Sequence, residues 1–130
     1  ALTTPESPEG LKALYDRALR WRSCGINRDL CWRDLVTFRA LAEAGPFEKY
    51  CTDPSVSVED RAQMRYRLAL ACFETAEHKV IIPMCQRILD ELKPQGITRQ
   101  QCLYMMAYHH GHCGHFEMAA EQLRSFLDAR

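Results

Sequence analysis

Four of the five histidines lie in one short segment, His109-His110-Gly111-His112-Cys113-Gly114-His115. Imidazole and thiolate groups are ligands for zinc, copper and nickel. His109 and Cys113 are four residues apart and share one helix face, and His115 could fold back on them from the next turn. These three residues are the metal-ligand candidates, although they lack zinc-finger spacing. A polar helix C-terminus, where histidine suits the helix dipole, explains the segment more simply. We therefore expect no bound metal.

The same segment offers a second chemistry, a cysteine–histidine pair. Cys113 directly follows His112, but neighbours on a helix point to different faces. Nucleophilic catalysis needs a nucleophile, a base and an orienting group that converge in a pocket. The sequence also has no phosphate-binding glycine loop and no H-E-x-x-H motif. We expect a protein that is not an enzyme and has no cofactor or small-molecule substrate. The alternative is a small metal- or thiol-dependent enzyme, or a metal-binding protein, centred on 109–115.

A second group of residues has the chemistry of a protein-binding surface. Aromatic side chains anchor many protein interfaces, and arginine holds carboxylates through paired hydrogen bonds. Both types occur at helical spacing in segments 57–76 and 98–113. The alternative is that the aromatic residues fill a core against residues 8–51, while the arginines are solvated. The partner-binding candidates are Arg61, Arg65, Tyr66, Phe73, Arg99, Tyr104 and Tyr108.

The charge balance restricts the class of partner. Among the 130 residues, 17 lysines and arginines balance 17 acidic residues, so the formal net charge is zero. This argues against a nucleic-acid binder that relies on a strongly basic field. No uncharged run is long enough to span a bilayer, so we expect membrane contact only through an anchor outside this chain. The expected partners are other proteins.

The cysteines indicate a reducing compartment. There are seven, an odd number, and none forms a C-x-x-C motif. Disulfide frameworks of secreted proteins usually have an even number of cysteines in short, loop-rich chains. Most of these cysteines instead lie on apolar helical stripes, where a free thiol behaves as a small hydrophobe. We predict reduced thiols and an intracellular location.

The elements that position these residues are all predicted to be helical. Apolar residues recur at helical spacing from end to end, and no alternating strand pattern occurs. The sequence predicts an all-α fold of six to seven antiparallel helices in a single domain, 7–130, after a tether at 1–6. Residues 7–51 form its N-terminal helices, and residues 57–130 form two helical hairpins.

Several local signals set the expected helix boundaries. Ser7 caps the first helix, Asn27 the second and Ser57 the helix that follows the 52–55 loop. Thr98 opens a capping box with Gln101. Gly45-Pro46 is expected to end the second helix, with one or two short turns following at 46–51. Pro83 is expected to lie in the first turn of a later helix. Lys93-Pro94-Gln95-Gly96 is expected to end the helix that contains Pro83.

Apolar stripes predict the core. The last helix, at 115–129, has the cleanest stripe, which includes Leu123. Leu68 lies in a run that is apolar nearly all round. We expect both leucines to be buried, and Trp21 and Trp32 to be core residues or contacts between the two halves.

The second half of the chain resembles the tetratricopeptide repeats. Shifting the sequence by 38 residues aligns Tyr66 with Tyr104, and Ala76 and Gly114 fall where that family has its inter-helix glycine. The repeat spacing is longer than the family's 34 residues, and residues 8–51 do not match it. The residues that carry the resemblance are Leu103, Met106, Ala107 and His110 in the first helix and Phe116, Ala119, Leu123 and Phe126 in the second.

The resemblance implies a non-enzymatic scaffold that binds proteins in a groove lined by helices 57–76 and 98–113. The last helix would then cap the stack or form an oligomer contact, which makes a homodimer possible. The layout of about seven helices rich in Cys, His and Arg is also similar to the soluble part of a membrane-anchored mitochondrial scaffold of kinetoplastid parasites. That likeness implies a mitochondrial location and an anchor that precedes this segment.

Overall fold

The computed structural model describes residues 7–23, 28–75, 78–112 and 114–128, and these residues confirm the predicted all-α fold. They contain seven α-helices and a short 3₁₀ turn, with no strand among them. No helix in these ranges is long and apolar enough to cross a membrane. The tether at 1–6 and the Asn27 cap lie outside them. The elements are α1 (Pro8–Ser23), α2 (Arg28–Ala42), α3 (Gly45–Cys51), α4 (Val58–Glu74), η1 (His78–Val80), α5 (Ile81–Glu91), α6 (Ile97–His112) and α7 (Phe116–Asp128).

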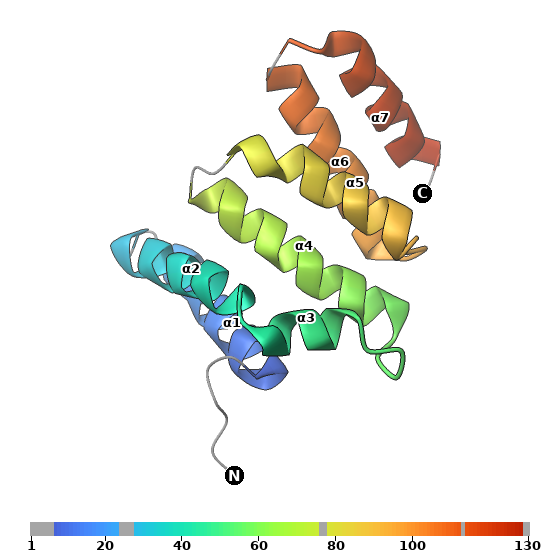
Figure 1. Cartoon of the computed structure of the whole chain (residues 1–130). Helices are drawn as coiled ribbons and strands as arrows, with labels where there is room; N and C mark the ends of the chain where they lie inside the picture. Colours follow the sequence, from blue (N-terminus) through green and yellow to red (C-terminus); the bar gives the residue numbers. More distant parts are fainter. Residues whose placement is uncertain (1–6, 24–27, 76–77, 113, 129–130) are drawn as a thin grey trace.

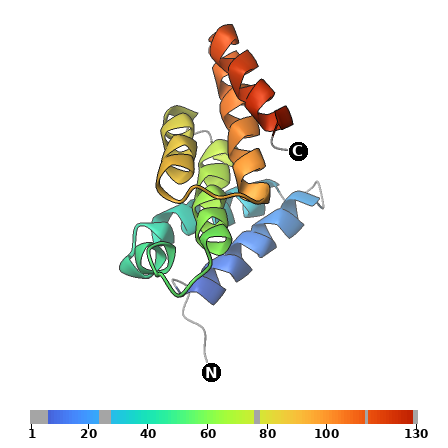
Figure 2. The same ribbon diagram turned by 90° about the vertical axis from the view of Figure 1, so that its right-hand side faces the viewer.

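Helix α4 lies at the centre of the molecule and joins two hydrophobic cores (Figure 1). It contacts α2 and α3 on one side and α5 and α6 on the other. Met64 and Ala71 belong to the first core, with Phe38 and Phe47. The second core includes α4 residues such as Tyr66 and lies against α5 and α6. Figure 2 shows α5 and α6 on opposite sides of the line of α4, with α7 against α6 at the edge.

Two of the predicted helix caps are confirmed by hydrogen bonds, and two further boundary signals by their positions. The Ser7 hydroxyl accepts a bond from the backbone N–H of Gly10 at 3.1 Å, and the Ser57 hydroxyl accepts one from that of Asp60 at 3.1 Å. Each bond satisfies a donor that the first turn of a helix leaves free. Pro83 lies in the first turn of α5, as predicted. Lys93, just after α5, has a positive φ of 47°, so the chain leaves the helix there.

The role of Gly45-Pro46 differs from the prediction. Helix α2 already ends at Ala42, and Gly45 begins α3, a distinct seven-residue helix. Pro46 lies in its first turn, where a missing N–H costs nothing and the fixed φ of proline favours the helix. Phe47 and Cys51 of α3 are buried in the first core.

The Thr98–Gln101 capping box is wrong, because α6 takes its cap from another helix. Helix α6 begins at Ile97, so Thr98 already lies inside its first turn. The backbone N–H and the hydroxyl of Thr98 donate to one carboxylate oxygen of Glu59, on α4, at 3.0 and 2.6 Å. A negative charge at a helix N-terminus is stabilising. Glu59 therefore fixes the start of α6 against α4.

We expect Glu59→Ala to lower the free energy of unfolding by about 1–2 kcal/mol, the usual cost of losing a helix cap. Glu91→Ala is the matched control, since Glu91 bonds Arg87 on the α5 surface, where an ion pair contributes about 0.5 kcal/mol or less. Urea unfolding of both variants measures the difference. Equal losses would show that Glu59 does not act as a cap.

The first hairpin is held by a buried carboxylate that apolar periodicity did not predict. Asp34 on α2 is 2% exposed and accepts two hydrogen bonds from the Arg17 guanidinium, both at 2.8 Å, and one from the Trp21 indole at 3.0 Å. Hydrogen bonds from Arg17 are the largest cause of the lowered pKa of Asp34. Trp21 packs against the first core, as expected, whereas Trp32 is about half exposed, so its core assignment is wrong.

The predicted burial of α7 is also wrong in its main part. Of the side chains in this helix, Ala119 is the one that the structure buries, and Leu123 is 42% exposed. Leu123 stays exposed because α7 is the outermost helix and packs mainly on α6, which leaves one side of its apolar stripe uncovered.

Leu68, which was also expected to be buried, is half-buried and packs against both cores.

Candidate protein-binding surface

Three large apolar side chains lie exposed along one face of α6. Ile97, Tyr104 and Tyr108 are seven and four residues apart, which places them on one side of a helix. Their exposed fractions lie between 43% and 64%. The opposite side of α6 is buried, with Cys102 and Met106 in the second core. We call Ile97, Tyr104 and Tyr108 the α6 stripe.

Neighbouring helices hold the two tyrosine rings of this stripe. The Tyr104 ring centroid lies 5.8 Å from that of Phe126 on α7. The Tyr108 ring lies 5.7 Å from Phe73 on α4, with an angle of 74° between the ring planes. Tilted and edge-to-face contacts of this kind are favourable for aromatic rings. The rings are therefore oriented before any partner arrives, which lowers the entropy lost on binding.

A hollow of about 290 Å³ opens at the C-terminal end of the stripe. Its walls come from α4, η1 and α6. The Phe73 ring contacts two of the imidazoles, with its centroid 5.8 Å from that of His78 and 5.4 Å from that of His109. Tyr108 and His112 approach to 4.4 Å. We call this space the aromatic–imidazole hollow; it is lined by Phe73, His78, Tyr108, His109 and His112.

Two histidines of α6 are buried, and in each one ring nitrogen bonds to no described group. These atoms are Nε2 of His109 and Nδ1 of His110. Burial is the main cause that lowers the pKa of both imidazoles. His78 lowers the pKa of His109 further, and His115 that of His110. Both rings are therefore expected to be neutral near pH 7.

These shifts predict a stability that falls on mild acidification. Because the pKa of His109 is lower in the folded state than in the unfolded state, the unfolded chain binds more protons once the pH drops below about 6.5. The stabilisation is complete above that pH and is lost as the pH falls towards the lower folded pKa. We expect the free energy of unfolding to decrease between pH 7 and pH 5, and His109→Gln to show a smaller decrease. Urea unfolding at both pH values measures this, and equal decreases would contradict it.

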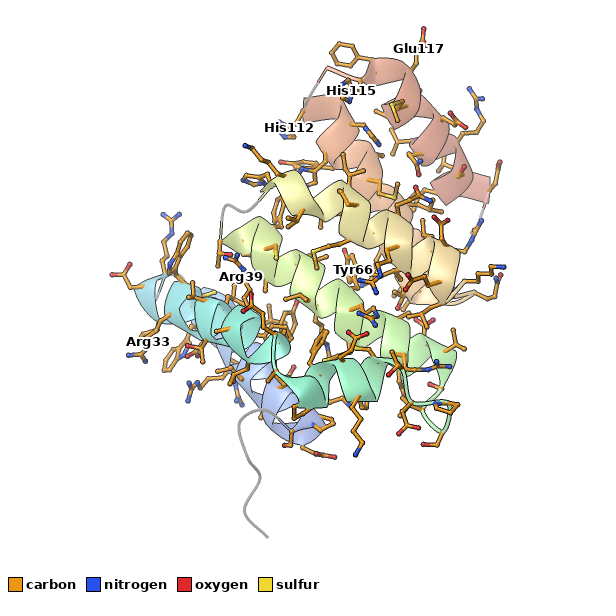
Figure 3. All side chains as sticks on the ribbon, in the orientation of Figure 1. Arg33, Arg39, Tyr66, His112, His115 and Glu117 are labelled. Atoms are coloured by element: carbon orange, nitrogen blue, oxygen red, sulfur yellow. The ribbon has the colours of Figure 1, made fainter. Side chains whose placement is uncertain are left out.

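The two described metal-ligand candidates, His109 and His115, have different ring neighbours. The His109 ring lies in the aromatic–imidazole hollow, whereas the His115 ring lies 5.8 Å from His110. Figure 3 shows His112 and His115 near the turn between α6 and α7. Cys113 lies outside the described residues. Within the ranges that the structure describes, no three His, Cys, Asp or Glu side chains are placed to hold a metal ion.

The prediction that Tyr66 binds a partner is wrong. Its side chain is buried in the second core (Figure 3), and burial raises its pKa. The reason is that other helices pack on both sides of α4, so at Tyr66 this helix does not line an open groove as the sequence predicted. Phe73, in its last turn, is half-buried and contacts Tyr108. Of the aromatic candidates, Tyr104 and Tyr108 on α6 are therefore exposed, and Phe73 on α4 is half-buried.

The three candidate arginines lie away from the α6 stripe. Arg65 is mostly buried and bonds Glu48 of α3 at 3.0 Å. Arg61 donates to the backbone carbonyl of Val56 at 3.0 Å and so holds the loop before α4. Arg99 is half-buried, and its position five residues before Tyr104 puts it on a different side of α6. Two of these arginines therefore have structural roles that their spacing did not reveal.

The described cysteines have the environment of inert thiols. Cys31, Cys51, Cys72, Cys85 and Cys102 are buried thiols that form no disulfide among the described residues. Burial raises the pKa of Cys51 to about 11, and contact with Cys85 raises that of Cys102. The thiolate is the reactive form, so Cys51 and Cys102 are poor nucleophiles. Cys24 and Cys113 lie outside the described residues.

Comparison with known proteins adds no relative. No protein-family model matches the chain, and no significant match exists among curated proteins or solved structures.

Proposed function

We propose that this protein is a non-enzymatic helical scaffold that binds another protein along the α6 stripe. The observation that carries the proposal is the exposure of Ile97, Tyr104 and Tyr108 on one face of a helix whose opposite face is buried. Tyrosine is enriched among the residues that dominate binding energy at protein interfaces. Large apolar side chains grouped on a surface mark an interaction site more often than isolated ones do.

The geometry of the stripe favours a helical segment of the partner. Its residues are seven and four positions apart along α6, which matches the repeat by which one helix packs on another. An amphipathic partner helix lying along α6 could set its apolar side chains between Ile97 and Tyr104 and between Tyr104 and Tyr108. The aromatic–imidazole hollow would then receive a terminal apolar side chain.

The thiols and the repeat-like sequence agree with this proposal. Buried cysteines with raised pKa values favour a role without thiol chemistry and suit a reducing compartment. The resemblance of residues 57–130 to tetratricopeptide repeats adds a protein-binding role. The likeness to the kinetoplastid scaffold adds a mitochondrial setting with a membrane anchor outside this segment.

Tyr104→Ala should weaken partner binding at least tenfold, which corresponds to about 1.4 kcal/mol. An aromatic anchor at an interface often contributes about 2 kcal/mol or more. The partner is isolated by co-purification from native cells and identified by mass spectrometry, and its affinity is then measured by titration calorimetry with purified protein.

Trp32→Ala is the matched control, because Trp32 is another half-exposed aromatic residue, on α2. It should bind the partner normally, and circular dichroism should show unchanged helicity in both variants. Unchanged binding by Tyr104→Ala would place the partner elsewhere. Loss of helicity in that variant would show that Tyr104 is structural and leave the proposal without its main residue.

A further inference from the structure

The outer face of α7 carries a second exposed apolar stripe, separate from the α6 stripe. Phe116, Ala120, Leu123 and Leu127 are spaced by four, three and four residues, which is the a/d pattern of a coiled coil. All four are exposed, and the three large ones have exposed fractions between 42% and 72%. We call these four residues the α7 stripe. We propose that it is the docking surface for a second copy of this chain, with the two α7 helices antiparallel.

The stripe is complementary to its own reversed copy. In an antiparallel pair, Phe116 lies opposite Leu127 of the second copy, and Ala120 lies opposite its Leu123. Each large leucine thus meets a small alanine at the centre, which lets the helices approach closely, while the bulkier pairs lie at the ends. The side of α7 that faces α6, with Ala119 and Phe126, is already occupied and leaves the stripe free.

The charges beside the stripe select the same arrangement. Glu117 and Arg124 are exposed, seven residues apart on one flank of α7, and the Glu117 side chain points away from the molecule (Figure 3). In an antiparallel coiled coil, equivalent flanks of the two helices meet. Each Glu117 therefore faces Arg124 of the second copy, which gives two ion pairs. A parallel pair would direct this flank towards the side that α6 covers.

The size of the stripe predicts a weak dimer. Helix α7 has 13 residues, so the contact is about 20 Å long. A single contact of this length offers less surface than a stable dimer usually buries, so we expect a dissociation constant of about micromolar or weaker. The two ion pairs lie at the rim, where charges determine orientation and partner choice more than affinity.

Charge exchange between variants tests the proposal directly. In a dimer of the Glu117→Arg variant, each arginine at position 117 faces Arg124 of the other copy. In a dimer of the Arg124→Glu variant, each glutamate at position 124 faces Glu117 of the other copy. Sedimentation velocity at low salt should show each variant at least tenfold weaker in self-association than the unaltered chain. An equal mixture of the two should recover association, because every new arginine then faces a glutamate. Arg33→Glu, on α2 far from Glu117, is the matched charge control and should dimerise normally (Figure 3).

Leu123→Lys should abolish the dimer, since it puts a charge at the centre of the α7 stripe. Circular dichroism checks that each variant remains folded. The proposal is overturned if the unaltered chain stays monomeric at all concentrations, which would assign the stripe to a different occupant. It is also overturned if the mixture fails to recover association, or if Arg33→Glu weakens the dimer as much as the α7 variants do. None of these results bears on binding by the α6 stripe.

Discussion

Phe38→Ala should lower the free energy of unfolding by about 3–5 kcal/mol. The Phe38 side chain is fully buried in the first core, and its ring lies 5.5 Å from that of Tyr15 on α1. Removing it leaves a cavity bordered by α1 and by the rest of α2, and close-packed surroundings collapse into such a cavity only in part. Urea unfolding followed by circular dichroism measures the loss.

Trp32→Ala on the same helix separates this effect from helix propensity. Trp32 is about half exposed, so its removal should cost about 1 kcal/mol or less. Both substitutions replace a large aromatic residue of α2 by alanine. Similar losses for the two variants would mean that α2 is rotated from its position in this structure.

Arg17→Met should lower the free energy of unfolding by about 2–4 kcal/mol at pH 7. It removes both 2.8 Å hydrogen bonds to Asp34 and leaves that carboxylate buried, with the Trp21 indole still donating to it. Breaking a buried ion pair by removing one partner is strongly destabilising because the other charge stays in the interior. The Arg17 side chain is itself half exposed, so the expected loss is smaller than for a fully buried ion pair.

The pH dependence of this loss identifies its cause. In the unaltered protein the pKa of Asp34 is lowered, so its carboxylate stabilises the fold above its usual pKa, and this contribution disappears as the pH falls through the lowered value. Without Arg17 the pKa of Asp34 should rise above its usual value. The difference between the variant and the unaltered protein should therefore shrink on acidification. A constant difference between pH 7 and pH 4 would contradict a buried charge as the cause.

The sequence predicted the helices well because their signals are local. Ser7 and Ser57 cap the first turns that follow them, and Pro83 lies within one turn of the start of α5, so neighbouring residues suffice to place each boundary. Thr98 shows the limit of such reasoning. Its cap is the Glu59 carboxylate, 39 residues earlier in the chain, and no local pattern could show that the two meet.

The sequence predicted the candidate site only in part, because periodicity defines an apolar face without showing what covers it. Tyr66 and Tyr104 occupy matching positions in the two repeat-like helices, yet Tyr66 is buried and Tyr104 exposed. The difference is that α4 has neighbours on both sides whereas one face of α6 stays open. The burial of Leu123 was wrongly predicted for the same reason: Leu123 lies on an apolar stripe, but α7 is an edge helix that leaves it exposed. The short spacing in the 109–115 segment could not show that His109 and His115 have different ring neighbours.

Helix α4 links the fold to the proposed function. Its first turn provides the Glu59 cap for α6, and its last turn provides Phe73, which holds Tyr108. The two ends of α4 thus hold α6 and its stripe in place, through contacts that do not involve a partner. A preoriented surface of this kind loses less entropy on binding than a flexible one.

The most direct test of the α6 stripe is site-specific photocrosslinking in native cell extract. A photoreactive phenylalanine analogue replaces Tyr108 in one sample and the half-exposed Trp32 in another. We expect a discrete crosslinked protein from position 108, absent from position 32, whose crosslinked peptide is an amphipathic helix and whose yield falls when Tyr104→Ala is added. Crosslinks of equal pattern from both positions, or crosslinks at 108 that Tyr104→Ala leaves unchanged, would contradict binding along the α6 stripe.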